Sequence, residues 1–118
     1  MVKKSARTSK FNNVKTVVDN ITFHSRKESV RYSQLKLYEK GGLIKDLRLQ
    51  VPYELIPKLV INGKTERAIK YVADFVYIDT VNGKEIVEDV KSIATITDVF
   101  KIKYRLMKSV HNIEIKIT

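Results

Sequence analysis

Three charged side chains interrupt two neighbouring apolar segments of the sequence. Asp74 lies inside the run YVADFVYID, and Asp89 and Lys91 lie two positions apart in the run IVEDVK. Side chains alternate between the two faces of a β-strand, so Asp89 and Lys91 are expected to project from the same face. Glu88 neighbours Asp89 but points to the opposite face, and for this reason we leave it out of the predicted site.

The dipeptide Asn82-Gly83 between these segments predicts a tight turn that pairs them as a β-hairpin. A hairpin centred near this turn places Asp74 opposite about position 90. The carboxylates of Asp74 and Asp89 are then expected to lie close together on adjacent strands.

Two carboxylates held together inside a sheet repel each other and resist ionisation unless a cation neutralises them. Mg²⁺ prefers hard oxygen ligands of this kind. A lysine beside them orients or helps to deprotonate an attacking water and stabilises the charge that develops on a phosphate. The three residues therefore predict phosphodiester hydrolysis. Simpler explanations exist: Asp74 alone fits a buried carboxylate paired with a lysine, and Asp89 with Lys91 fits a solvated ion pair at a strand edge.

The composition restricts the number of domains and the class of partner. With 118 residues, 43% of them hydrophobic and 31% charged, the chain fits one globular domain. It has no cysteine, which excludes disulfides and thiolate metal sites. No apolar run approaches the ~20 residues of a membrane-spanning helix. The net charge of +10 indicates a polyanionic partner such as nucleic acid, although solubility alone also explains it.

Apolar spacing and turn signals predict one α/β domain over residues 14–118, after a flexible basic arm over residues 1–13. Ser25 and Glu28 form a capping-box pattern at the start of the first helix, and Pro52 predicts an edge position or a bulge in the first long strand. The central sheet is expected to be mixed and flanked by helices, in the order helix, strand, strand, strand, helix, strand. The expected elements are a hairpin over 14–23, a helix over 26–40, strands over 43–57, 66–79 and 84–91, a helix over 97–110 and a strand over 111–118.

At these positions the sequence resembles the PD-(D/E)XK nuclease superfamily, which has the restriction-endonuclease-like fold. The superfamily pattern is an acidic residue on one strand, followed by D-x-K or E-x-K on the next. Asp74 followed by Asp89-Val90-Lys91 matches this pattern. Ala73 stands where the pattern usually has a proline.

A second resemblance covers most of the chain. The segment KFNNVKTVVDNITFHSRKESVRYSQL, residues 10–35, is similar to the opening of small phage and prophage endonuclease-like proteins. The runs YVADFVYID, IVEDVK and TITDVFKIK follow in the same order as in that group. Asn20 and His24 stand where the group has glycine and aspartate. Asn20 is compatible with the turn because asparagine tolerates a left-handed backbone.

This resemblance implies a restriction-endonuclease-like core with a catalytic site of Glu28, Asp74, Asp89 and Lys91. The three carboxylates would hold Mg²⁺, with Mn²⁺ able to substitute, and the substrate would be DNA. Glu28 also fits a purely local role, since a glutamate at this position of a capping box bonds the backbone of Ser25.

Further polar residues are candidates for the rim of the site and for contacts with DNA. Gln50 lies at the end of the first long strand, although polar strand ends are usually solvated. Lys103 either reaches a phosphate or lies on a solvated face of the second helix. Six tyrosines lie among the basic residues and are expected mostly to form half-buried core. The residues expected to hold the DNA backbone, together with the basic arm, are Lys101, Lys103, Arg105 and Lys108.

The sequence therefore predicts a metal-dependent DNA endonuclease that acts in phage recombination, repair or DNA processing in the cytoplasm of a bacterial host. Its basic, polar start lacks the pattern of a signal peptide. A domain of this size offers little surface to a long duplex, so we expect a homodimer or a phage or host partner protein. Two alternatives stay open: a non-catalytic DNA-binding or recombination accessory protein that retains the fold, and a phage protein that acts on a host factor.

Overall fold

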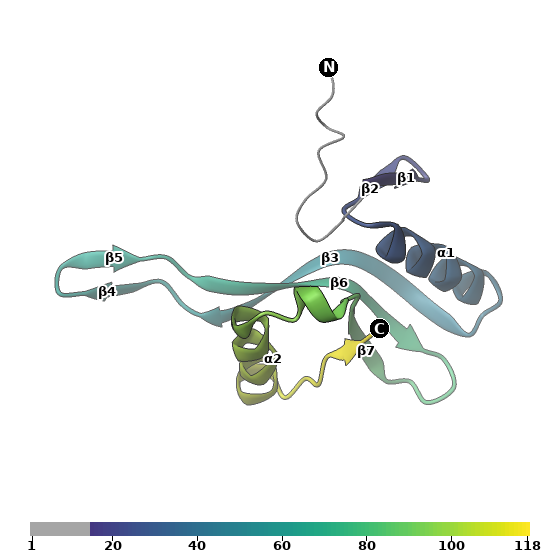
Figure 1. The fold of residues 1–118 in the computed structure, drawn as a ribbon. Helices are drawn as coiled ribbons and strands as arrows, with labels where there is room; N and C mark the ends of the chain where they lie inside the picture. Colours follow the sequence, from purple (N-terminus) through teal and green to yellow (C-terminus); the bar gives the residue numbers. More distant parts are fainter. Residues whose placement is uncertain (1–14) are drawn as a thin grey trace, which may run out of the picture.

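The computed structural model describes residues 15–118 and is built around a four-stranded mixed sheet (Figure 1). The strands lie in the order β3 (Ile44–Ile56), β6 (Ile69–Asp79), β7 (Glu85–Asp89) and β8 (Lys116–Ile117). The pairs β3–β6 and β6–β7 are antiparallel, whereas β7 and β8 run parallel.

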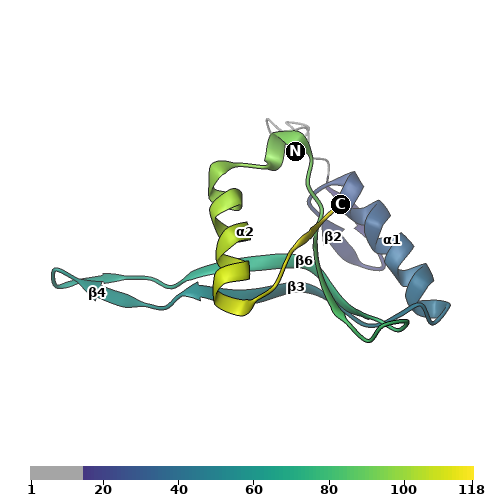
Figure 2. The same ribbon diagram turned by 90° about the horizontal axis from the view of Figure 1, so that it is seen from below.

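Helix α1 (Arg26–Lys40) covers one face of this sheet and helix α2 (Asp98–His111) covers the other (Figures 1 and 2). The sheet separates two hydrophobic cores, one on each face. Adjacent residues of β6 belong to different cores: Phe75 packs on the α1 side and Val76 on the α2 side. Each large apolar side chain buried in this way contributes roughly 1.5–3 kcal/mol. The buried α1-side core comprises Phe23, Tyr32, Leu35, Ile44, Phe75 and Tyr77, and the α2-side core comprises Leu55, Tyr71, Ala73, Val76, Val87, Phe100, Met107 and Ile115.

Both helices begin where the capping signals in the sequence predict. The Oγ of Ser25 accepts a hydrogen bond from the Glu28 N–H at 3.1 Å, and the Oγ1 of Thr97 accepts one from the Phe100 N–H at 3.1 Å. These bonds satisfy N–H groups that the first helical turn leaves without an intrahelical partner. The helix predicted over 26–40 is confirmed at both ends, and the second helix lies within one residue of its predicted bounds.

Two small hairpins lie outside the central sheet. β1 (Thr16–Val18) pairs with β2 (Ile21–Phe23), which confirms the hairpin predicted before the first helix. Asn20 in its turn has a left-handed φ of 62°, a conformation that asparagine tolerates. β4 (Leu59–Ile61) pairs with β5 (Lys64–Glu66) and forms a ribbon beyond the end of the sheet.

The middle strands differ from their predicted lengths. The strand expected over 66–79 is divided, because its first residue pairs within the ribbon and β6 starts only at Ile69. The strand expected over 84–91 ends at Asp89, and a short 3₁₀ helix, η1 (Ile93–Thr95), follows it. Pro52 lies on β3, at the edge of the sheet, as predicted.

The strand predicted over 111–118 is largely wrong. α2 continues to His111, and β8 contains two residues, Lys116 and Ile117, which pair with Glu88 and Asp89 of β7. Ile115 is buried, but Ile117 is 41% exposed, so the alternating isoleucines do not share one buried face.

The coarse fold prediction is confirmed: the chain forms a mixed α/β fold with a mixed central sheet and two α-helices in its described part. The basic arm predicted over residues 1–13 lies outside the described residues. Among residues 15–118, no helix has the length and apolar character needed to cross a membrane.

Candidate active site

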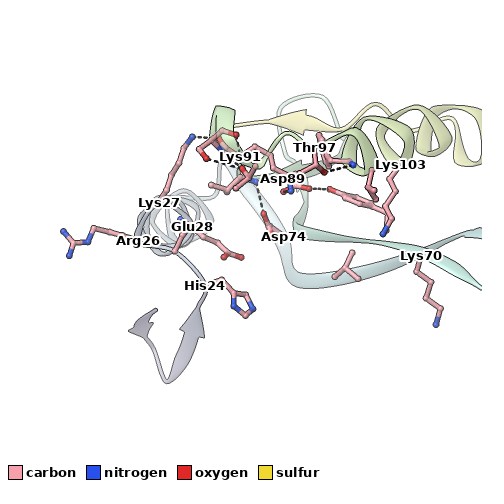
Figure 3. Close-up of a pocket in the computed structure, with 18 residues that line it drawn as sticks. His24, Arg26, Lys27, Glu28, Lys70, Asp74, Asp89, Lys91, Thr97 and Lys103 are labelled. Atoms are coloured by element: carbon pink, nitrogen blue, oxygen red, sulfur yellow. Dashed lines mark hydrogen bonds and ion pairs between the residues drawn. The ribbon is translucent and has the colours of Figure 1, made fainter. Parts of the chain in front are cut away.

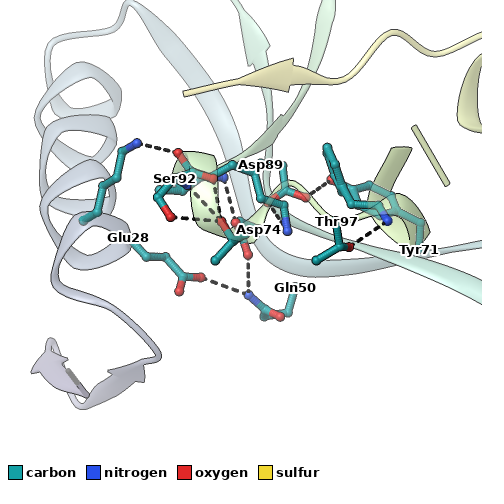
Figure 4. A network of polar contacts seen from close by, with 12 residues as sticks. Glu28, Gln50, Tyr71, Asp74, Asp89, Ser92 and Thr97 are labelled. Carbon is teal, nitrogen blue, oxygen red and sulfur yellow. Dashed lines mark hydrogen bonds and ion pairs between the residues drawn. The ribbon is translucent and has the colours of Figure 1, made fainter. Parts of the chain in front are cut away.

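The Asp74 and Asp89 carboxylates lie next to each other where the pairing of β6 with β7 ends (Figure 4). The final registered pair is Phe75 with Glu88, so the next step along both strands brings Asp74 opposite Asp89. The expected partner at about position 90 was therefore one residue too far along. The Val90 N–H donates to Asp74 Oδ2 at 2.8 Å, so a side chain satisfies the backbone where regular pairing stops.

The environment of this pair disfavours the charged form of both carboxyl groups. Burial, followed by the neighbouring Asp74 carboxylate, raises the pKa of Asp89 to about 7. The Tyr71 hydroxyl donates to Asp89 Oδ2 at 2.7 Å, which opposes this rise only in part. Burial also raises the pKa of Asp74. The protein alone therefore leaves the charge of two adjacent carboxylates incompletely compensated.

Lys91 lies beside Asp89, as strand alternation predicts. Its Nζ is 3.8 Å from Asp89 Oδ1 and 4.5 Å from the centre of the Phe100 ring. Its backbone is held on both sides: the N–H donates to the Thr118 carbonyl at 3.0 Å, and the carbonyl accepts from Lys27 Nζ at 2.5 Å. These contacts fix the amine near the carboxylate pair while its side chain stays 21% exposed.

Gln50 connects carboxylates from two different elements (Figure 4). Its Nε2 lies 3.3 Å from Glu28 Oε2 on α1 and 3.4 Å from Asp74 Oδ1 on β6. Gln50 has a left-handed φ of 54°, which is uncommon outside glycine and costs of order 1–3 kcal/mol. Gln50 thus contacts two of the predicted site residues directly.

Glu28 takes part in the cap of α1 through its backbone but not through its carboxylate. Its N–H donates to the Ser25 Oγ, whereas its carboxylate accepts from the amide of Gln50 and lies near enough to Asp74 to help raise the pKa of that group. Glu28 is buried, with 6% of its surface exposed. Its side chain therefore faces the acidic cluster, not the backbone of the capping box.

Glu88 lies on the opposite face of β7 and stays outside the cluster, as predicted. Its carboxylate accepts two bonds from Arg31, at 2.5 and 3.0 Å, one from the Tyr77 hydroxyl at 2.6 Å and one from the Thr118 hydroxyl at 3.0 Å. Burial raises the pKa of Glu88, but the Arg31 bonds outweigh burial and hold this pKa below its usual range. Glu88 is a satisfied structural carboxylate.

The acidic cluster opens into a cleft of about 620 Å³ between the starts of α1 and α2 (Figure 3). Its lining includes the acidic residues Glu28, Asp74 and Asp89 and the basic residues Lys91 and Lys103. The cleft therefore combines a negative centre with a basic rim. The remaining basic and imidazole residues of the lining are His24, Arg26, Lys27 and Lys70.

Of the four basic residues predicted to hold the DNA backbone, one lines the cleft. Lys103 lines the cleft, whereas the other three are exposed outside its lining. Lys108, for example, forms an ion pair with Glu114 at 2.9 Å. The three residues outside the cleft lining are Lys101, Arg105 and Lys108.

Comparison with known proteins places the chain in a family. A family model described as "Protein of unknown function (DUF1064)" matches residues 8–118, which is nearly the whole chain. The chain belongs to the DUF1064 family. No curated protein and no solved structure matches it. Since the description of the DUF1064 family names no reaction, the chemistry has to be argued from the site.

Two contacts of this DUF1064 site were missed at the level of sequence. Tyr71 is buried in the core, as expected for most of the tyrosines, but its hydroxyl also donates a hydrogen bond to Asp89. A buried tyrosine hydroxyl usually has a hydrogen-bond partner, and this rule could have indicated the contact. Lys27 reaches the carbonyl of Lys91 across 64 positions, and no local pattern marks such a contact.

The donor set of the DUF1064 site suits a hard cation. Among the described residues, no group of three or more His, Cys, Asp and Glu lies close enough to hold a metal ion. Mg²⁺ does not need such a group, because it commonly binds through one or two carboxylates and completes its shell with waters and substrate phosphates. Asp74 and Asp89 supply such a pair, and their raised pKa values show the incomplete charge compensation that a cation would relieve.

Proposed function

We propose that the protein is a metal-dependent DNA endonuclease that hydrolyses phosphodiester bonds with Mg²⁺, for which Mn²⁺ substitutes. The observation that carries the proposal is the carboxylate pair Asp74 and Asp89, with the Lys91 amine 3.8 Å from Asp89, on the wall of the cleft. Clefts that contain titratable groups with strongly shifted pKa values are frequent sites of catalysis.

The charge of the cleft supports a metal-assisted reaction on phosphate. A DNA phosphate that approaches Asp74 and Asp89 is repelled unless a cation lies between them. When bound, Mg²⁺ supplies the positive charge that polarises a phosphate and makes water a stronger nucleophile at neutral pH. A protein that only binds DNA gains nothing from two carboxylates at the centre of its basic cleft.

The chain's own residues have separate roles in this proposal. Asp74 and Asp89 hold the cation, and the Tyr71 hydroxyl orients Asp89. Lys91 orients the attacking water and stabilises negative charge on the phosphate. Glu28 supplies a third carboxylate to the cleft, outside the pair that holds the cation, and the amide of Gln50 lies between it and Asp74.

The basic rim of the cleft supports DNA as the substrate. Amines and a guanidinium around the acidic centre attract a phosphate backbone without reading its sequence. Lys103 on α2 and Lys70 on β6 lie on one side of this rim, and Arg26 and Lys27 at the start of α1 lie on it as well. A strand of DNA that crosses the cleft would therefore pass over the carboxylate pair.

We also propose that the core is restriction-endonuclease-like and that the protein acts on phage DNA in a bacterial cytoplasm, as a homodimer or with a partner protein. The acidic residue and the D-x-K segment on adjacent strands support this assignment. The central elements follow in the order α1, β3, β6, β7, α2 and β8.

Cleavage of a labelled DNA panel tests the function directly. Linear duplex, single strand, flap and four-way junction are incubated with Mg²⁺, with Mn²⁺ and with EDTA. We expect metal-dependent products from the wild-type protein and a loss of about 10²-fold or more in Asp74→Asn, Asp89→Asn and Lys91→Ala. Asp46→Asn removes one exposed carboxylate from β3 and should cleave like the wild type.

The same panel distinguishes the accessory role from catalysis. Tight binding without products, on every DNA and with every metal, would mean that the protein is a DNA-binding accessory protein and not a nuclease. Equal cleavage by Asp74→Asn, Asp89→Asn and the wild type would place the reaction elsewhere. We expect both variants to bind DNA at least as tightly as the wild type, because each loses a negative charge.

A further inference from the structure

The β4–β5 ribbon, residues 58–67, projects from the end of the sheet with neither helix beside it (Figures 1 and 2). Leu59 pairs with Glu66 and Ile61 with Lys64 across a tight Asn-Gly turn. All six strand residues are exposed, and Val60 is 69% exposed. An isolated two-stranded hairpin is only marginally stable in water, so a ligand that covers this ribbon would stabilise it.

The charge of the ribbon favours a polyanion as that ligand. Lys58, Lys64 and Arg67 are exposed, against a single acidic residue, Glu66. Within the described part of the chain, none of these three basic side chains forms an ion pair. Free surface cations of this kind bind phosphates with release of counterions.

The ribbon is continuous with the cleft of the candidate active site. β6 leaves the ribbon at Ile69, and the next residues, Lys70 and Tyr71, line the cleft. Lys103 of α2 lines the same cleft. A basic path therefore leads from the carboxylate pair along β6 and out onto the ribbon.

The shape of the ribbon fits one particular surface of DNA. The major groove of B-DNA is ~12 Å wide and admits a two-stranded β-ribbon. Alternation places Leu59, Ile61, Lys64 and Glu66 on one face of the ribbon, with Lys64 next to the turn and Glu66 one pair farther from it. This face offers an amine for phosphates or guanine and apolar groups for thymine methyls.

We infer that the β4–β5 ribbon inserts into the major groove of a DNA duplex, so that the substrate of the cleft carries a duplex arm beside the cleaved bond. This inference rests on the proposed function for the identity of the ligand. The inference adds the requirement that the substrate contains a stretch of duplex, because unpaired DNA lacks the groove that the ribbon fills. The cleft alone does not impose this requirement.

Binding measured without cleavage tests the ribbon. Fluorescence anisotropy in EDTA follows a labelled duplex of about 20 base pairs, roughly two helical turns, and a single strand of the same length, over a series of salt concentrations. The ribbon variant is Lys64→Ala with Arg67→Ala. The control is Lys45→Ala with Lys84→Ala, which removes the same charge from exposed positions away from the ribbon.

We expect the ribbon variant to bind duplex about 10-fold or more weakly, with the slope of log K against log salt reduced by about 1.8 for two lost phosphate contacts. The single strand should lose less affinity, and the control pair should bind duplex like the wild type. Equal duplex affinity and equal slopes for the ribbon variant and the wild type would overturn the inference.

Two further results separate the competing explanations. A wild-type dimer that becomes monomeric in Val60→Ser with Ile61→Ser, while duplex affinity stays unchanged, would assign the ribbon to a second copy of the chain and overturn the inference. Cleavage of single strands by a wild-type protein that does not bind duplex would reject the ribbon and keep the nuclease. The absence of both binding and cleavage would reject both proposals.

Discussion

The protonation state of Asp89 couples the candidate site to the stability of the protein. In the folded, metal-free chain its pKa is raised to about 7, whereas an unfolded aspartate ionises near ~3.9. Between about pH 4 and pH 7 the folded state therefore binds protons that the unfolded chain has lost. The contribution of Asp89 to the free energy of unfolding is therefore expected to fall as the pH rises across this window.

Asp89→Asn should remove most of this dependence, because an amide stays neutral at every pH. In EDTA at pH 8 we expect the variant to be more stable than the wild type by about 1–3 kcal/mol, with a smaller difference at pH 5. Urea denaturation at both pH values measures the effect, and Asp46→Asn is the matched control. A stability advantage of Asp89→Asn over the wild type that shrinks from pH 5 to pH 8 would contradict the assigned direction of the pKa shift.

Two substitutions of Gln50 distinguish the effect of its strained backbone from the effect of its side-chain amide. Gln50→Ala and Gln50→Gly both remove the bonds to Glu28 and Asp74, but only glycine adopts the left-handed φ of 54° without strain. We expect the glycine variant to be more stable than the alanine variant by about 1 kcal/mol in chemical denaturation. Both variants should lose cleavage to the same extent. A glycine variant that cleaves like the wild type would show that the amide has no role in positioning.

At the scale of elements, the Arg31–Glu88 pair attaches α1 to β7 behind the site. Glu88 is fully buried and the Arg31 side chain is 17% exposed. Removal of one partner of a buried ion pair leaves the other charge without compensation.

Arg31→Ala should therefore destabilise the protein by about 3–5 kcal/mol. The matched control is Arg48→Ala, because Arg48 pairs with Glu85 at 2.9 Å and both side chains are about half exposed. Loss of this exposed pair should cost only about 0–1 kcal/mol. Thermal or urea unfolding compares the two variants. Equal losses in both would mean that the buried pair does not fasten the helix to the sheet.

An element can be predicted from the sequence when the residues that define its ends lie close together in the chain. The first helix was predicted at both ends because Ser25 and Glu28 mark its start within four residues. The strand over 111–118 is much shorter than predicted: α2 takes up its first residue, and pairing with β7 is limited to Lys116 and Ile117, which the alternating isoleucines do not mark. The β4–β5 ribbon was also not predicted as a separate element. Its six strand residues are all exposed, so its sequence lacks the alternation of apolar and polar residues that marks a strand with one buried face.

At the scale of the whole molecule, the candidate site also combines contacts that local sequence patterns predict with contacts that depend on tertiary packing. The proximity of Asp74, Asp89 and Lys91 follows from strand alternation and one hairpin turn, both of which can be read along the chain. The contacts of Gln50 and Lys27 depend on how α1 packs against the sheet. Tertiary packing of this kind leaves no periodic pattern in the sequence. Lys27 therefore became visible only in the folded structure, whereas Gln50 is a candidate from its place at the end of the strand and only its contacts required the structure.

Residues late in the chain hold the backbone around the site. The Thr118 N–H donates to the Asp89 carbonyl at 3.0 Å, and the Lys91 N–H donates to the Thr118 carbonyl at 3.0 Å. A nascent polypeptide that has been translated only as far as α2 carries both aspartates of the candidate site but lacks the strand that fixes the D-V-K segment. Since folding of a domain can begin during synthesis, the order of translation matters: the backbone of the D-V-K segment gains these hydrogen bonds only after β8 and Thr118 have been made.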